Sequence, residues 1–216
     1  HFSKTHKEEH AYLQLKNYSK DADKLERILN LITKLAQQIS HSAKKNSPIK
    51  HYLDHHDSVP LWVLVNYLSL GIMSNFYICL TQTIQDQICK EYSKQFKKDY
   101  GSTYQVTSDT IAGVLKSANL FRNVCAHEER LYNYKITKSP KSAHASKLLS
   151  IHQHLLNGSL FSMVAFLKIV LTKKDFKTLV KTLDDLFATY NSKFSTITFP
   201  QILAEMGFPT DWRRQL

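Results

Sequence analysis

Residues 111–133 read IAGVLKSANLFRNVCAHEERLYN. Wound as a helix at about 100° per residue, this stretch gathers its apolar side chains on one face. That face holds Ile111, Val114, Leu115, Ala118, Phe121 and Cys125. The period predicts a helix from Thr110 to about His127 that packs on a core, with Ser108 and Asp109 offering oxygens to cap its start.

Most of the remaining chain shows the same helical period. We expect helices over residues 22–42, 60–70, 81–100, 159–171, 175–190 and 200–206, with Gly71 allowing a bend or close contact before residues 72–80 continue. Residues 43–57 are polar and predict a loop, and residues 132–150 predict a basic surface excursion. With only 5 Gly and 5 Pro in 216 residues, a sheet protein with many tight turns is disfavoured, so the fold predicted is an all-α bundle.

Composition also bears on partners and compartment. Lys and Arg number 29 against 18 Asp and Glu, a net charge of +11 that favours nucleic acid or another polyanion as partner. The apolar run over residues 59–80 is broken by polar side chains and Gly71, so we expect no membrane span. Cys79, Cys89 and Cys125 have no paired spacing, and we expect them to be reduced core residues of a cytoplasmic protein.

The helix over residues 110–127 also carries reactive side chains. Arg122 falls about 20° from Ile111 on the apolar arc, where a guanidinium needs a partner or a cleft. Asn119, Asn123, His127 and Arg130 fall near one another on the adjoining polar face. Such a set suits RNA cleavage by transphosphorylation, because imidazole exchanges protons near neutrality and guanidinium binds phosphate oxygens. The spacing alone favours a structural reading instead, in which the Arg lies along the helix end beside a His that hydrogen-bonds a carbonyl oxygen.

Three motifs that occur in the same order as in a known family favour the catalytic role over the structural one. The stretch FRNVCAHEERLYN resembles the signature of Abi-like (AbiD/AbiF) abortive-infection proteins, which belong to the HEPN ribonuclease superfamily. VPLWVLVNYLSLGIMSNFY resembles the family's buried helix pair, and MGFPTDW resembles its terminal motif. The resemblance spans about residues 60–212 and implies a HEPN-like helical bundle with extra helices.

The resemblance further implies a function. It matches Arg122 and His127 to the catalytic Arg and His of a metal-independent endoribonuclease toxin, with Asn123 as the polar residue that follows the Arg. It implies a homodimer, a structured small RNA as antitoxin, and no cofactor. It also implies a division into a helical segment over residues 1–58, part of a longer N-terminal region, and a HEPN-type domain over residues 59–216. Glu128 departs from the family, which often has a second His there.

Basic and aromatic residues follow the predicted catalytic helix. We expect this segment to bind RNA, because lysines can hold the backbone while aromatic rings stack on bases. The residues are Arg130, Tyr132, Lys135, Lys138 and Lys141.

A histidine-rich cluster lies upstream. It comprises His51, Asp54, His55, His56 and Asp57, and it falls in the predicted loop without a third ligand at a recognisable spacing. We therefore do not expect a metal site there.

Two other functional classes fit the same residues. In one, the chain is a non-catalytic RNA-binding module whose Arg122 and His127 hold RNA or pack the dimer. In the other, the helical bundle is a scaffold for a second protein, a nucleotidyltransferase. Cleavage by wild type, and none by Arg122→Ala or His127→Ala with folding intact, would distinguish the nuclease from both of these classes.

Overall fold

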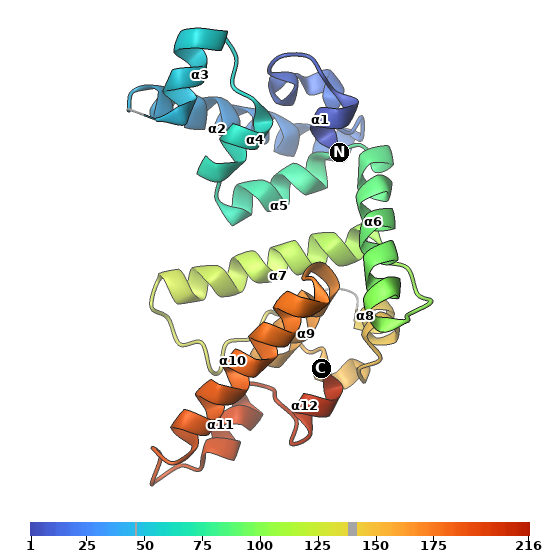
Figure 1. Cartoon of the computed structure of the whole chain (residues 1–216), viewed down its shortest axis with the longest axis vertical. Coiled ribbons are helices and arrows are strands. Elements are labelled where there is room, and N and C mark those ends of the chain that lie inside the picture. Colours follow the sequence, from blue (N-terminus) through green and yellow to red (C-terminus); the bar gives the residue numbers. More distant parts are fainter. Residues whose placement is uncertain (46, 138–141) are drawn as a thin grey trace. The chain divides into compact units, whose positions relative to one another are not determined.

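The computed structural model describes residues 1–45, 47–137 and 142–216, so Lys138 and Lys141 lie outside the described residues. Helices and turns account for the secondary structure of the described part, which contains no strand (Figure 1). The all-α prediction is therefore confirmed. Among these same residues, no helix is both long and apolar enough to cross a membrane.

The chain forms two compact units, His1–Ile88 and Cys89–Leu216. Helix α6, Gln82–Tyr100, begins in the first and ends in the second. The boundary predicted between residues 58 and 59 falls within the first unit, and the division into two domains stays a prediction.

The first unit is built around α2, which packs against α3 and α5 (Figure 1). Its elements are α1 Phe2–Thr5, η1 Ala11–Leu13, η2 Leu15–Asn17, η3 Ala22–Lys24, α2 Leu25–Ala43, α3 Pro48–His56, α4 Leu61–Leu64, η4 Val65–Tyr67, α5 Leu70–Cys79 and the start of α6. Buried Ile28, Leu31 and Leu35 form the inner stripe of α2 at helical spacing. The Tyr12 hydroxyl donates to the carbonyl oxygen of Val59 at 2.5 Å and so fastens the first turns to the chain before α4.

Residues 43–57 are not a loop, as predicted, because most of them form α3. The Ser47 side chain accepts a hydrogen bond from the Lys50 amide at 3.2 Å and caps the helix, while Pro48 occupies the first turn, where its missing N–H costs nothing. Lys50 and Asp54 then pair at 2.8 Å one turn apart, and Ile49 is buried. The cap at Ser47 and the Lys50–Asp54 pair therefore stabilise a helix that the polar composition of the segment does not predict.

The predicted helix over residues 60–70 is also wrong in detail. Helix α4 and η4 end at Leu68, whose ψ of 139° is extended, and α5 starts anew at Leu70. Ser69 makes the break possible because its side chain accepts a hydrogen bond from the Ile72 amide at 3.3 Å. The chain thus bends at residues 68–69 and not at Gly71.

The second unit packs α7 and α10 against the apolar helix α9 (Figure 1). Its elements are the end of α6, α7 Ser108–Ala126, α8 Ser142–Leu149, η5 Gln153–Leu155, α9 Leu160–Val170, α10 Lys173–Asn191, α11 Phe199–Glu205 and α12 Trp212–Gln215. Phe208 and Trp212, from the stretch MGFPTDW, are buried and pack edge to face at 5.5 Å. That motif therefore contributes to the core.

The prediction of a surface excursion over residues 132–150 holds only in part. Residues 142–149 form α8, and its Ala145, Leu148 and Leu149 are buried. These three recur at helical spacing within KSAHASKLLS, a pattern that the many polar neighbours obscure.

Candidate active site

Helix α7 carries the predicted catalytic residues, and its buried stripe differs from the predicted one. The start is capped by Thr107, not by Ser108 or Asp109, because the Thr107 side chain accepts from the Thr110 amide at 3.3 Å. Buried positions are Thr110, Ile111, Val114, Ser117, Phe121 and Val124. This stripe includes small polar residues and is rotated away from Arg122, which is exposed and not within the apolar face as predicted. Cys125, also predicted in the core, is exposed, whereas Cys79 and Cys89 are buried.

Asn123 contacts Arg122 through its side chain and His127 only through the ordinary helical backbone hydrogen bond. Its Oδ1 accepts a hydrogen bond from Arg122 Nη1 at 3.1 Å, and its carbonyl oxygen accepts one from the His127 amide at 3.0 Å. No carboxylate among the described residues forms an ion pair with Arg122. Among the described residues, the exposed Arg122 guanidinium is therefore bonded to an uncharged neighbour and not to a carboxylate.

The helix ends immediately after this pair. His127 is the last half-helical residue, and Glu128 takes a left-handed conformation with φ of 55°. The Glu128 amide then donates to Cys125 O at 3.4 Å and the Glu129 amide to Val124 O at 3.0 Å, which is the Schellman arrangement normally made by glycine. The exposed His127 side chain therefore sits at a fixed corner of the backbone.

The chain after this corner is anchored under α7. Tyr134 packs edge to face on Phe121 with ring centroids 5.1 Å apart, and buried Ile136 joins Phe121 and Met163 in one apolar cluster. The Ile136 amide donates to the carbonyl oxygen of Gly158 at 2.9 Å. Gly158 has φ of +85°, and a Cβ there would overlap the Ile136 carbonyl. This positioning role was not predicted, although the turn-forming pair Asn157–Gly158 is a sequence signal for it.

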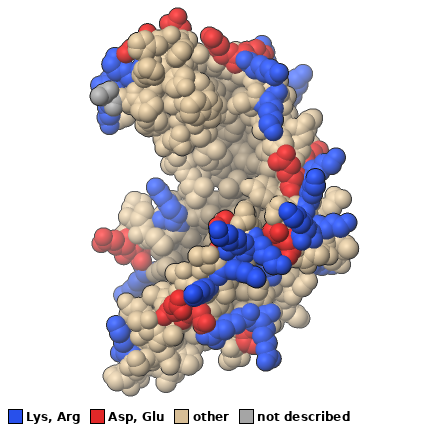
Figure 2. Space-filling view, viewed as in Figure 1, with Lys and Arg blue, Asp and Glu red and all other residues tan. Residues whose placement is uncertain are grey.

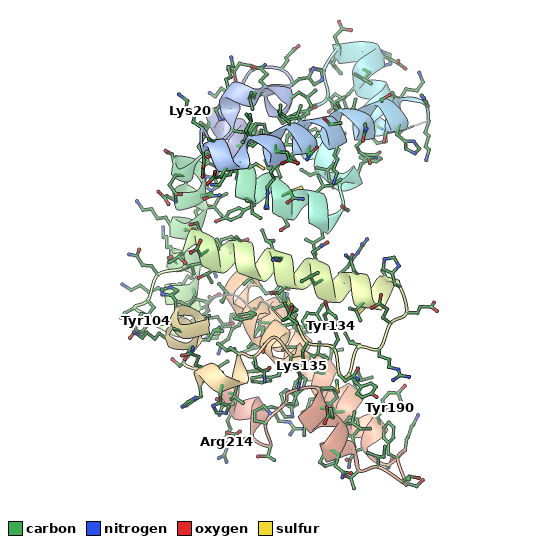
Figure 3. All side chains as sticks on the ribbon, turned by 180° about the vertical axis from the view of Figure 1, so that it is seen from behind. Lys20, Tyr104, Tyr134, Lys135, Tyr190 and Arg214 are labelled. Atoms are coloured by element: carbon green, nitrogen blue, oxygen red, sulfur yellow. The ribbon has the colours of Figure 1, made fainter. Side chains whose placement is uncertain are left out.

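The residues predicted to bind RNA alternate with these anchors. Arg130, Tyr132 and Lys135 are exposed, with Tyr132 44% accessible, and Figure 3 shows Lys135 beside the anchored Tyr134. Arg130 does not share a helical face with Asn123 as predicted, because α7 ends at Ala126. Three of the five predicted residues therefore form an exposed basic and aromatic segment next to the corner, and Lys138 and Lys141 lie outside the described residues.

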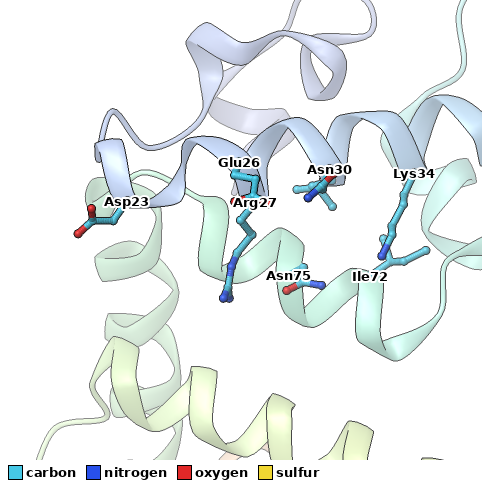
Figure 4. A pocket seen from close by; sticks show the side chains of 8 residues that line it. Asp23, Glu26, Arg27, Asn30, Lys34, Ile72 and Asn75 are labelled. Carbon is cyan, nitrogen blue, oxygen red and sulfur yellow. The ribbon is translucent and has the colours of Figure 1, made fainter.

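A polar pocket in the first unit is a second candidate site. It has a volume of about 360 Å³ between α2 and α5, where Arg27, Lys34 and Asn75 face the same opening (Figure 4). Asp23 and Glu26 also line it. These carboxylates offset the cations, so the pocket offers an anion less net attraction than a purely basic site would.

The histidine cluster proves to be helical. His51 and His55 lie one turn apart on α3 with ring centroids 4.6 Å apart, while Asp54 pairs with Lys50. That pairing, chiefly through the hydrogen bond from Lys50, lowers the pKa of Asp54. Among the described residues, no three His, Cys, Asp or Glu side chains are grouped so that they could hold a metal ion.

Comparison with known proteins gives one match. The family model described as Abi-like protein matches residues 1–133, a segment that contains both VPLWVLVNYLSLGIMSNFY and FRNVCAHEERLYN. Neither the curated proteins nor the solved structures yielded a match. Because the matched segment is more than half of the chain, the chain belongs to the Abi-like proteins, a family associated with abortive infection and phage defence.

Proposed function

We propose that this protein is a metal-independent endoribonuclease of the HEPN type, with Arg122, Asn123 and His127 at its active site. The observation that carries the proposal is the contact of Asn123 with the exposed guanidinium of Arg122 and with the backbone of His127, the residue bearing the imidazole. Membership in a phage-defence family and the net charge of +11 add support, because RNA cleavage is one way in which an infected cell is halted.

The proposed reaction needs a proton acceptor, a charge stabiliser and a proton donor. A base removes the proton from a ribose 2′-hydroxyl, and the 2′-oxygen attacks the adjacent phosphorus. The bond from phosphorus to the 5′-oxygen breaks, and an acid returns a proton to that oxygen. The products are a 2′,3′-cyclic phosphate and a 5′-hydroxyl end.

The two charged side chains take complementary roles in this scheme. The exposed imidazole of His127 takes or gives the proton, since it is the side chain suited to proton exchange near neutral pH. Arg122 stabilises the extra negative charge on the phosphorane through its forked donors. Because one imidazole cannot be base and acid at once, a second copy of the chain supplies the other, and the active species is a homodimer. A structured RNA that occupies the same basic surface restrains it.

The test measures cleavage of a labelled RNA by the full chain in EDTA, with analysis of the product ends. Wild type is expected to yield cyclic phosphate ends, while Arg122→Ala and His127→Ala each lose at least about a hundredfold in rate. Sedimentation of the same samples reports the dimer, and dilution below its dissociation constant should lower specific activity.

Matched controls are Arg214→Ala and His41→Ala, which remove the same side-chain types at exposed positions outside the motif; Figure 3 shows Arg214 away from α7. Circular dichroism checks folding. Wild-type protein that binds RNA without cutting it, with binding lost in Arg122→Ala, would favour the non-catalytic RNA-binding module. Cleavage unaffected in both motif variants would exclude the proposed site.

A further inference from the structure

A pocket of about 400 Å³ opens in the second unit beside the end of α6. Its walls come from Tyr100 on α6, Tyr104 on the following segment, the end of α8 with Lys147 and Ser150, and Lys168 on α9. None of the described residues that line it is acidic. The pocket is therefore lined by two lysines and three aromatic residues, Phe96, Tyr100 and Tyr104, and by no carboxylate among the described residues.

Lys168 is the unusual member of this pocket. It is the one charged residue of α9, which reads LFSMVAFLKIV, and it is half-buried. Its Nζ lies 4.9 Å from the centroid of the Tyr100 ring and 6.0 Å from that of Phe176. No carboxylate among the described residues pairs with it, and burial lowers its pKa. A partly buried ammonium group has lost hydration, and a bound anion would stabilise it by charge attraction and hydrogen bonding.

Tyr100 also lacks a partner. Its hydroxyl oxygen is buried and makes no hydrogen bond to the described residues, which is rare for a buried polar atom. Burial, with a smaller effect of Asp99, raises the pKa of Tyr100, so the hydroxyl keeps its proton. An acceptor entering the pocket could satisfy this donor.

The rim of the pocket offers a flat apolar surface. Gly101 ends α6 with φ of +71°, and the segment that follows leaves Tyr104 48% exposed at the edge of the second unit (Figure 3). An exposed ring beside lysines is the combination on which single-stranded nucleic acid stacks its bases.

The surface next to the pocket is basic. Lys173 Nζ donates to Asp99 O at 2.7 Å, which brings the start of α10 against the end of α6. Lys97, Lys98, Lys174 and Lys177 are exposed around this junction, and Figure 2 shows Lys and Arg gathered over it. A nucleic-acid backbone leaving the pocket would thus meet further cations.

We propose that this pocket binds one nucleotide of single-stranded RNA, with its phosphate held by Lys168, Lys147 and the Tyr100 hydroxyl and its base stacked on Tyr104. Residues 101–104 precede the start of α7 at Ser108, which lies about 21 Å along that helix from Arg122 at 1.5 Å per residue. The pocket would anchor the RNA at a distance from the cut. This inference rests on the proposed function for the identity of the RNA as substrate.

The experiment uses a labelled 2′-O-methyl oligouridylate, which lacks the attacking hydroxyl and reports binding whether or not the protein cuts RNA. Lys168→Met keeps the apolar stem and removes the charge. We expect roughly tenfold weaker binding to this variant and a salt dependence lower by about one counterion. Tyr104→Ala should also weaken binding roughly tenfold.

The matched control is Lys193→Met, since Lys193 also lies over a tyrosine ring, at 4.8 Å from the centroid of Tyr190, but outside the pocket. Unchanged affinity in Lys168→Met, with a wild-type melting profile, would overturn the proposal. So would binding of free uridine monophosphate that depends on Lys168 while oligouridylate binding does not. Wild type that never cuts RNA but still shows the Lys168 effect would refute the nuclease alone.

Discussion

Asn123 stands between Arg122 and His127, accepting from the guanidinium of one through its side chain and from the amide of the other through its carbonyl oxygen. The side-chain contact can be changed without touching the helix. In Asn123→Ala, Arg122 keeps its charge and loses its support, and we expect cleavage to fall about tenfold. In Asn123→Asp, a carboxylate neutralises the guanidinium, and the loss should be larger, about a hundredfold.

Single-turnover cleavage rates of the two variants make this comparison. The Asp variant should melt close to wild type, because the new pair with Arg122 offsets a negative charge near the helix C-terminus. Equal rates in both variants would mean that Asn123 does not set the state of Arg122.

Glu128 holds a conformation that glycine adopts more easily. Its φ of 55° costs a residue with a side chain about 1 kcal/mol. Glu128→Gly should therefore raise the free energy of unfolding by roughly 0.5–1 kcal/mol, measured by urea titration. Glu128→Ala, which keeps the strain, is the control; a gain of the same size there would point to the carboxylate and not to the backbone.

Gly158 leaves room for the anchored segment below α7. Gly158→Ala would place a Cβ against the Ile136 carbonyl at a positive φ, and we expect a loss of at least about 2 kcal/mol of stability. Hydrogen exchange should show added opening at the Ile136 amide, which Gly158 O now accepts. Gly101→Ala is a useful comparison, since φ there is +71° but nothing lies within 4 Å of the added carbon.

The buried cation at Lys168 predicts a dependence of stability on pH. Its pKa is lowered in the folded state, so between that value and the ordinary lysine value of about 10.4 the unfolded chain binds more protons. The contribution of Lys168 to stability is unfavourable below this window and improves as pH rises through it. Its charged neighbours Lys147, Lys173 and Asp99 are the same in wild type and in Lys168→Met, so their own titration cancels to first order when the two are compared.

We therefore expect the stability of wild type relative to Lys168→Met to increase as the pH is raised from neutrality toward the ordinary lysine pKa of about 10.4. Parallel urea titrations at each pH give the difference directly. A difference that stays level across that range would show that Lys168 is solvated well enough to titrate normally.

The sequence predicted the helices well where an apolar stripe faces the core. Helix α9 matches closely because Ser159 caps it and its interior is apolar throughout. Helix α3 was missed because Pro48 and its polar neighbours suggest a loop until Ser47 is recognised as a cap. Periodicity cannot detect such a start when the helix buries little more than Ile49.

The catalytic assignment of Arg122, Asn123 and His127 stays a prediction, and the apolar environment predicted for Arg122 was wrong. Arg122 was assigned to the apolar face because Leu115 and Cys125, which flank it on the helix, are apolar residue types. The face that is buried includes Thr110 and Ser117, which a pattern of apolar residues does not detect. The role of Gly158 and the pairing of Lys168 with Tyr100 could not be predicted, because they depend on contacts between residues distant in sequence. Contacts of this kind produce no periodic pattern in the local sequence.

The exposure of Cys125 has a practical consequence. It stands on the last turn of α7, between Arg122 and His127, while Cys79 and Cys89 are buried. A thiol-directed fluorophore should therefore label the native chain selectively at this turn, with no engineered cysteine. Such a label would test the proposed binding of RNA and the proposed pairing of subunits from a position within the motif itself.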